Sequence, residues 1–157
     1  MSDGYNIRLA TPGEAPILGE MRRRMFLDMG KPDDERIRKV VEAFVPWIAN
    51  SIREGRYMSW VASTDTGELV SNAGMLLIEW PPNSRDTNPV RGYIMNVWTH
   101  PDHRRRGLAR RLMEAAISEA RSRQIKVTAL HASDDGRALY EQLGYRQSRE
   151  MIRVEEQ

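Results

Sequence analysis

Hydrophobic and polar positions change their period along the chain, and each change marks a predicted element. Residues 5–9 are predicted to form a short strand, after which Thr11, Pro12 and Glu14 have the spacing of a capping box with proline at the first helical position. The helix that follows ends at Gly30 and has an apolar stripe made of Ile17, Leu18, Met21, Met25 and Met29.

A second helix is predicted from Asp33, with a stronger helical period. Its apolar face consists of Ile37, Val40, Val41, Phe44, Val45 and Ile48. Pro46 lies inside it, so a kink or a break is expected there. Two strands follow, at residues 57–63 and 69–80, and Asp65-Thr66-Gly67 between them has the composition of a hairpin turn.

The second half of the chain alternates strands and helices. Residues 92–99 are β-branched and aromatic without helical period, which predicts a largely buried strand. A helix begins at Leu108, with its apolar face at Leu112, Met113, Ala116, Ile117 and Ala120. A strand at residues 126–132 should lie parallel to residues 92–99 by a right-handed crossover. A short helix from about Asp134 should end at Gly144.

The turn before Leu108 carries the most informative pattern, Arg-x-x-Gly-x-Ala, at Arg104, Gly107 and Ala109. A helix start leaves backbone N–H groups unpaired at the positive end of the macrodipole, so anionic oxygens bind there. Gly107 removes the side chain that would block close approach. Taken alone, such a pattern also fits a solvated helix start.

With its flanks, the pattern becomes specific. The order strand, Arg-x-x-Gly-x-Ala, helix, strand, then Leu139-Tyr140 and Gly144-Tyr145, resembles the GNAT superfamily of acetyl-CoA-dependent N-acetyltransferases over residues 93–146. The resemblance implies an α/β fold of three layers, with a mixed central sheet of six to seven strands and about four helices. The sheet should splay apart between its fourth and fifth strands. A single domain over residues 1–157 is expected.

The resemblance also implies a site for acetyl-CoA. Its pantetheine arm and acyl carbonyl are expected at Val97, Trp98 and Thr99, and its pyrophosphate at Arg104, Arg105, Arg106, Gly107, Leu108, Ala109 and Arg110. Many relatives place an asparagine at the end of the fifth strand. Here Ser133 is expected to donate in its place, and Asp134 can instead be the N-cap of the next helix.

Two side chains are assigned catalytic roles. The resemblance places the Tyr140 hydroxyl near the sulfur as general acid, and a packed tyrosine with a satisfied hydroxyl is the alternative. No carboxylate lies on residues 92–99, where part of the family has its base, so Glu79 is the candidate base, acting through a water chain. A solvated strand-end glutamate is the other interpretation. His131 shares a face with Val127 and Ala129 and is interpreted as a core residue or a base.

Three further segments are ambiguous. Residues 81–91 form either a border of the acceptor site or an ordinary mobile loop. The consecutive Arg22, Arg23 and Arg24 would fan around a helix, which favours a solvated surface over a substrate contact. His100, Asp102 and His103 lack a spaced third ligand, so the interpretation is a structural turn without metal.

Composition limits the possible chemistry, compartment and partners of the protein. The 157 residues include no cysteine, which excludes disulfides and thiolate nucleophiles and favours the cytoplasm. Lys and Arg number 24 against 22 for Asp and Glu, and the arginine cluster in the turn suits an anionic cofactor. Neither a nucleic-acid partner nor a membrane partner is expected.

The preferred hypothesis is an N-acetyltransferase that acts on a primary amine by direct attack in a ternary complex. The alternatives are a non-catalytic acyl-CoA-binding regulatory domain, favoured by the missing carboxylate, and a nucleic-acid-binding module that uses the basic turn. The identity of the amine stays open, because small molecules and proteins both fit. A homodimer formed through a strand at residues 149–154 is a further hypothesis.

Overall fold

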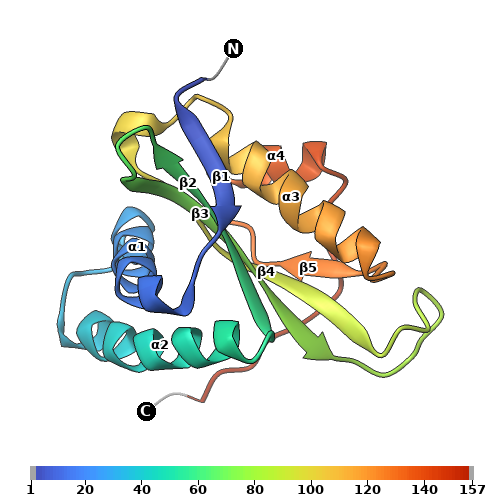
Figure 1. Cartoon of the computed structure of the whole chain (residues 1–157). Helices are drawn as coiled ribbons and strands as arrows, with labels where there is room; N and C mark the ends of the chain where they lie inside the picture. The colour runs from blue at the N-terminus through green and yellow to red at the C-terminus, as the bar shows by residue number, and fades with distance from the viewer. Residues whose placement is uncertain (1–2, 156–157) are drawn as a thin grey trace.

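The computed structural model describes residues 3–155, and these form one twisted sheet with helices on both faces (Figure 1). The strands are β1 (Tyr5–Leu9), β2 (Tyr57–Thr64), β3 (Leu69–Glu79), β4 (Val90–Thr99) and β5 (Thr128–Leu130). The α-helices are α1 (Ala15–Asp28), α2 (Glu35–Arg53), α3 (Leu108–Ser122) and α4 (Arg137–Gln142), and short 3-10 turns stand at Pro12–Glu14 and Pro101–His103.

Strand order in the sheet follows the chain, β1-β2-β3-β4-β5. The first four strands are antiparallel, and β5 lies parallel to β4. Loops without a helix join β2, β3 and β4, whereas α1 and α2 lie between β1 and β2. The α3 crossover makes that parallel pairing possible, as the sequence predicted.

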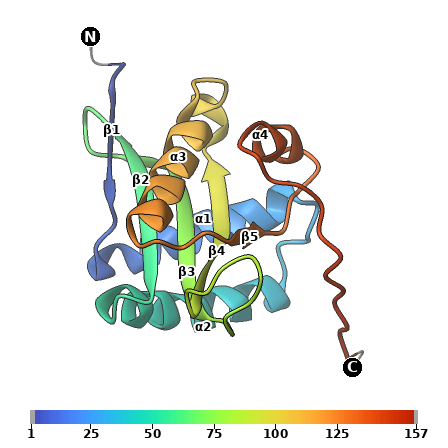
Figure 2. The same cartoon turned by 90° about the vertical axis from the view of Figure 1, so that its right-hand side faces the viewer.

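Each face of the sheet has its own core. On one face α3 and α4 cover a cluster that includes Ala73, Met75, Ile94, Leu112 and Tyr140. On the other face α1 and α2 cover a cluster that includes Leu18, Ile48, Tyr57, Val61 and Trp98. Figure 2 shows α3 in front of the sheet and α1 and α2 behind it. The two faces therefore present different side chains of β4 to different helices.

Local signals explain the helix boundaries. The capping box at Thr11 and Glu14 is present, and the Asp34 carboxylate accepts N–H bonds from Arg36 and Ile37 at the start of α2. The expected break at Pro46 does not occur, since α2 continues to Arg53. Its buried face against the sheet outweighs the lost backbone bond.

The C-terminal part differs from the prediction. The described residues form five strands, whereas the sequence predicted six to seven, and residues 149–154 form no strand. This segment runs past the β5 edge without pairing (Figure 2). Its apolar side chains have no face of the sheet to cover, so Met151, Ile152 and Val154 are 93%, 78% and 74% exposed. The β5 strand is also shorter than the predicted 126–132.

Among the described residues, no helix is long and apolar enough to cross a membrane.

Candidate active site

The turn between β4 and α3 presents an uninterrupted run of backbone donors. Arg105 has φ +63° and Gly107 has φ +74°, so two left-handed residues direct the chain into α3. No side chain caps this helix. The backbone N–H groups of residues 105–110 donate to no other described residue. Such a set of converging N–H groups at a helix start binds phosphate oxygens.

Gly107 is the residue that keeps this turn open. A β-carbon built there meets no atom within 4 Å, so the space beyond it is free. The same position has a left-handed φ, which side chains rarely adopt. Both the conformation and the open space leave room for the pyrophosphate that is expected here from the sequence.

The arginines of the turn have different partners. The Arg104 guanidinium donates to Asp28 Oδ2 at 2.6 Å and to the Thr99 carbonyl at 2.9 Å, so it ties the turn to the end of α1. Arg110 contacts Gln142 of α4, and Arg111 pairs with Asp3. Within residues 3–155, the side chains of Arg105 and Arg106 have no hydrogen bond or ion pair. These two are the cations that remain available to an anion.

Asp28 connects the turn with the strand before it. Its carboxylate also accepts from Trp98 Nε1 at 2.8 Å. Partial burial by itself would raise the pKa of Asp28, but the hydrogen bonds from Trp98 and Arg104 outweigh it and lower the pKa. The carboxylate is therefore ionised at neutral pH and holds α1, β4 and the turn together.

A bulge lies in β4 immediately before the predicted acyl-binding residues. The register with β3 shifts between Asn72, opposite Trp98, and Gly74, opposite Met95, so β4 has one residue more than β3 across this stretch. Asn96 lies in the bulge with φ +59°. On the other side, the pairing of β4 with β5 ends at Ile94 and Leu130. Val97, Trp98 and Thr99 therefore lie beyond the paired part of β4 and β5, where the splay is expected from the sequence.

A buried polar network holds the bulge. Asn96 Nδ2 donates to the Tyr57 hydroxyl at 2.8 Å, and Arg22 Nη1 donates to Asn96 Oδ1 at 2.5 Å. The Arg22 guanidinium also stacks on the rings of Phe26 and Phe44, at 4.9 and 4.8 Å. Complete burial raises the pKa of Tyr57 to about 12, against the opposing effects of Asn96 and Arg22.

The expectation that Arg22, Arg23 and Arg24 form a solvated surface is wrong for Arg22. Arg23 does lie at the surface and pairs with Glu20 and Asp33. Arg22 instead points inward, and its Nε is buried without a partner. Arg24 lies over the Trp98 ring at 4.9 Å. Three successive helical residues do fan out, but two of them face the sheet.

Tyr140 stands on the α3 side of the splay and is only 7% exposed. Its ring packs on Gly136, where a β-carbon would come within 2.7 Å of Tyr140 Cε2. The Tyr140 hydroxyl makes no hydrogen bond to another described residue, and it is not among the fully buried unpaired atoms. The alternative of a packed tyrosine whose hydroxyl is satisfied by the protein therefore does not apply. Burial, reinforced by Tyr145, raises the pKa of Tyr140 above its ordinary value.

The other predicted site residues have different surroundings. Ser133 begins the turn into α4, where its Oγ accepts from the Gly136 N–H at 3.2 Å. Gly136, rather than Asp134, is the N-cap of α4. Glu79 is exposed and pairs with Val90 at the far end of β4 from the bulge, so it lies away from Val97, Trp98 and Thr99. Sequence reasoning left His131 without a partner, and the structure places it against Tyr93.

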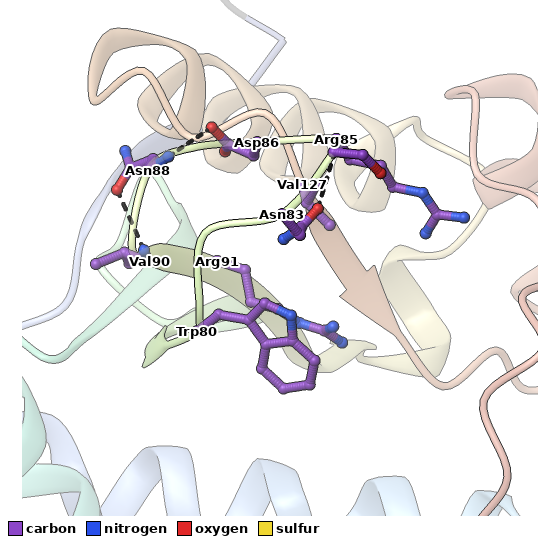
Figure 3. Close-up of a pocket in the computed structure, with 9 residues that line it drawn as sticks. Trp80, Asn83, Arg85, Asp86, Asn88, Val90, Arg91 and Val127 are labelled. Atoms are coloured by element: carbon purple, nitrogen blue, oxygen red, sulfur yellow. Dashed lines mark hydrogen bonds between the residues drawn. The ribbon is translucent and has the colours of Figure 1, made fainter.

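The 81–89 loop is held by its own side chains. The Asp86 carboxylate accepts the N–H groups of Asn88 and Lys126, which lower its pKa. A cavity of about 330 Å³ lies under the loop, and Figure 3 shows Arg91 lying across the Trp80 indole at its floor. The guanidinium of Arg91 is 4.0 Å from the indole centroid. The hydrogen bonds of Asp86 and Asn88 tie the loop to residues 123–126.

Two histidines, His100 and His103, precede the turn at residues 104–107, which we call the phosphate turn after its predicted role. Both have partners within the fold. His100 Nδ1 accepts from the Asp102 N–H at 3.1 Å, and the Tyr5 hydroxyl contacts His103 Nδ1 at 2.8 Å. Within the described part of the chain, no group of three or more metal-ligating side chains is present.

These features define an α/β protein in which a helix start with unpaired N–H groups follows a strand whose parallel pairing ends early. The model of the acetyltransferase (GNAT) family matches residues 20–145. The chain therefore belongs to the GNAT acetyltransferase family, as its motifs indicated.

Solved structures agree with this assignment. A GCN5-related N-acetyltransferase from Ralstonia eutropha JMP134 is 30% identical, with a TM-score of 0.89 over 96% of this chain and 98% of that one. A predicted acetyltransferase from Clostridium acetobutylicum, solved with acetyl-CoA, is 24% identical, with a TM-score of 0.86 over 96% of each chain. An aminoglycoside acetyltransferase from an uncultured soil metagenomic sample is 20% identical and shares the fold, with a TM-score of 0.71 over 100% of each chain. No functionally curated protein matches.

Proposed function

We propose that this protein transfers an acetyl group from acetyl-CoA to a primary amine by direct attack in a ternary complex. The observation that carries the proposal is the run of unpartnered N–H groups at residues 105–110, beside the bulge in β4. The pyrophosphate would bind these donors, with Arg105 and Arg106 adding positive charge. Family membership, and a relative solved with acetyl-CoA, support the same cofactor.

The pantetheine arm would lie in the splay between β4 and β5. There the backbone of Val97, Trp98 and Thr99 would hold the thioester carbonyl, and an N–H aimed at its oxygen would stabilise the negative charge that develops during attack. A preorganised donor of this kind contributes roughly 3 kcal/mol. The hydrogen bonds from Arg22 and to Tyr57 fix Asn96 and with it this backbone.

The chemistry needs no covalent enzyme intermediate, in keeping with the absence of cysteine. The amine nitrogen attacks the thioester carbon, the C–N bond forms and the C–S bond breaks. The departing thiolate takes the proton of the Tyr140 hydroxyl, which has no competing protein partner. Glu79, the base predicted from the sequence, lies at the end of β3 and would reach the amine only through the water chain that the prediction included.

Calorimetric titration with acetyl-CoA tests the cofactor site. We expect micromolar binding by the wild type and loss of binding in Gly107→Glu, which puts a carboxylate where the pyrophosphate would lie. Gly107→Gln is the matched control for the strained backbone at φ +74°. Gly55→Glu, also at φ +74° and at the opposite end of β3 from the turn, controls for a new carboxylate. A folded wild type that does not bind acetyl-CoA would refute the proposal. Equal losses in the Glu and Gln variants would assign the effect to the backbone.

The alternative function is acyl-CoA binding without turnover. It is favoured by the lack of a carboxylate on β4. Release of the CoA thiol from acetyl-CoA, measured with a panel of primary amines, separates the two functions. Binding without any amine-dependent release would support the regulatory domain.

We infer further that two copies associate through the C-terminal segment. The support is the exposure of Met151, Ile152 and Val154 next to β5, an edge strand whose only neighbour in the described residues is β4. Light scattering over a range of concentrations should show a dimer that Ile152→Lys weakens. A monomer at all concentrations would refute this inference and leave the acetyl transfer proposal unaffected.

A further inference from the structure

We propose that His131, held by Tyr93, is the group that takes the proton from the acceptor amine. This inference rests on the acetyl transfer proposed above. The Tyr93 hydroxyl contacts His131 Nδ1, and the two ring centroids are 5.8 Å apart with an angle of 54° between the rings. The pair joins β4 to the end of β5, and no role in cofactor binding has been assigned to either residue.

The pair stands where the two parallel strands part. Tyr93 is opposite Ala129, and the last residues in register are Ile94 and Leu130. His131 is the next residue along the chain, and β4 bulges at Asn96, just beyond Met95. The imidazole therefore lies at the apex of the splay, next to the backbone that would hold the thioester.

The pair and Tyr140 are on opposite faces of the sheet. The side chain of Thr128 lies on the α3 side, since its Oγ1 bonds to the Tyr145 hydroxyl in the same core as Tyr140. Alternation along β5 puts His131 on the other side, where it meets Tyr93. An amine that arrives from the α1 and α2 side would meet His131, while the departing sulfur would be near Tyr140. Separate groups would then serve the two proton transfers of direct attack.

The surroundings keep Tyr93 a neutral phenol. Burial raises the pKa of Tyr93, Glu150 raises it further, and Arg91 opposes the shift. Arg91 and Glu150 are the charged groups on this side, and their side chains approach to 3.6 Å. A neutral phenol oxygen can accept the Nδ1–H of His131. That tautomer leaves Nε2 unprotonated and free to accept a proton.

Position favours this pair over Glu79. Glu79 is opposite Val90, four residues before Ile94, which is about 13 Å along a strand. His131 needs no chain of waters to cover that distance.

The proton balance of the step is complete. The neutral amine forms the C–N bond and passes one proton to His131 Nε2. The C–S bond breaks with its electron pair on sulfur, and the thiolate takes one proton from Tyr140. Proton exchange through water then returns His131 to its neutral form and Tyr140 to the phenol, leaving an N-acetylated amine and the CoA thiol.

Nitrogen-15 NMR of the imidazoles tests the tautomer without any acceptor. The chain has only three histidines, and His103, which contacts Tyr5, offers a second tyrosine–histidine pair as an internal control. In the wild type with acetyl-CoA bound, we expect His131 as the Nδ1–H form. Tyr93→Phe should convert His131 to a mixture of tautomers and leave the His103 signal unchanged. A His131 that is protonated at Nε2 and not at Nδ1 in the neutral wild type would overturn the proposal.

Kinetics test the proton transfer itself. With the panel amines that release CoA, His131→Gln should lower kcat/KM by about 10²-fold. Tyr93→Phe should lower kcat/KM to a smaller extent, whereas His103→Gln should leave it unchanged. Calorimetric binding of acetyl-CoA should stay within about twofold of wild type. If His131→Gln keeps the full rate while Glu79→Gln loses it, Glu79 is the base and the proposal fails. A wild type that binds no acetyl-CoA would instead refute the proposed function.

Discussion

The hydroxyl of Tyr57 occupies the place where a side chain on Gly74 would begin. A β-carbon built on Gly74 comes 1.6 Å from the Tyr57 oxygen and 2.3 Å from its ring carbon Cζ. Gly74 pairs with Met95 beside the bulge, and the same hydroxyl accepts from Asn96. The absence of a side chain on β3 therefore makes room for the network that shapes β4.

Gly74→Ala should consequently destabilise the protein. Tyr57 is fully buried and has no free space to retreat into, so overpacking of about 1–3 kcal/mol is expected. Urea denaturation measures the change. Gly13→Ala is the matched control, because its nearest neighbour would be an ordinary 3.9 Å away, and it should change the free energy of unfolding by less than about 0.5 kcal/mol. Equal effects of the two substitutions would contradict the packing argument.

The arginines of the phosphate turn should separate into two classes. Arg105→Gln or Arg106→Gln should weaken acetyl-CoA binding by about tenfold, since each removes a charge-assisted contact to phosphate. The loss should shrink as salt is raised. Arg104→Gln should act mainly on stability, because that guanidinium is engaged with Asp28 and the Thr99 carbonyl. Calorimetry at two salt concentrations measures the affinity of each variant for acetyl-CoA, and thermal unfolding measures its stability. A larger loss of affinity in Arg104→Gln than in the other two would show that Arg104 leaves Asp28 when the cofactor binds.

Tyr140→Phe should lower kcat by about 10²-fold with little change in the affinity for acetyl-CoA. Because burial raises the pKa of Tyr140 above 10, the wild-type hydroxyl keeps its proton through mildly alkaline pH. Ionisation of Tyr140 should therefore not reduce the rate until the pH exceeds 10. Tyr145→Phe, which removes the hydroxyl bonded to Thr128, should cause a much smaller loss. Full activity in Tyr140→Phe would transfer the role of acid to solvent.

Glu14 should contribute stability that acid removes. The hydrogen bond from Arg8 is the largest effect on this carboxyl and lowers its pKa to about 2. A lowered folded-state pKa stabilises the protein at neutral pH, and this contribution begins to fall below about pH 4.5 and is lost as the pH passes through about 2. Glu14→Gln should thus lower the urea midpoint at pH 7, and the difference from wild type should vanish near pH 2. The exposed Glu54, paired with Arg56, is the control, and Glu54→Gln should change little at either pH.

The sequence predicted those parts of the fold and site that depend on neighbours in the chain. The turn into α3 is one such part, because Gly107, the basic run and the periodicity of α3 lie within one short segment. The strands before and after α3 followed from their composition and from the crossover rule. The splay of β4 from β5 came from the family resemblance.

The bulge network could not be predicted in this way. Asn96 takes its left-handed conformation beside Tyr57, 39 positions away, and Arg22, 74 positions away. No local pattern marks such a residue within a β-branched strand. The partnership of Tyr93 and His131, 38 positions apart, is hidden for the same reason.

The prediction of a strand in the C-terminal segment was wrong for a different physical reason. Residues 149–154 have apolar side chains typical of a strand, but a strand forms only where a neighbour offers backbone partners. Within one copy, no described strand pairs with this segment.

The Arg22 network limits how this protein can be redesigned. A library that seeks new amine acceptors would naturally randomise the sheet-facing side chains of α1. Arg22 is one of them, yet it supports the strand that would hold the thioester carbonyl, so replacing it would impair the reaction for every acceptor at once. Libraries that keep Arg22 and vary Met25 and the 81–89 loop should yield altered selectivity with the catalytic backbone intact.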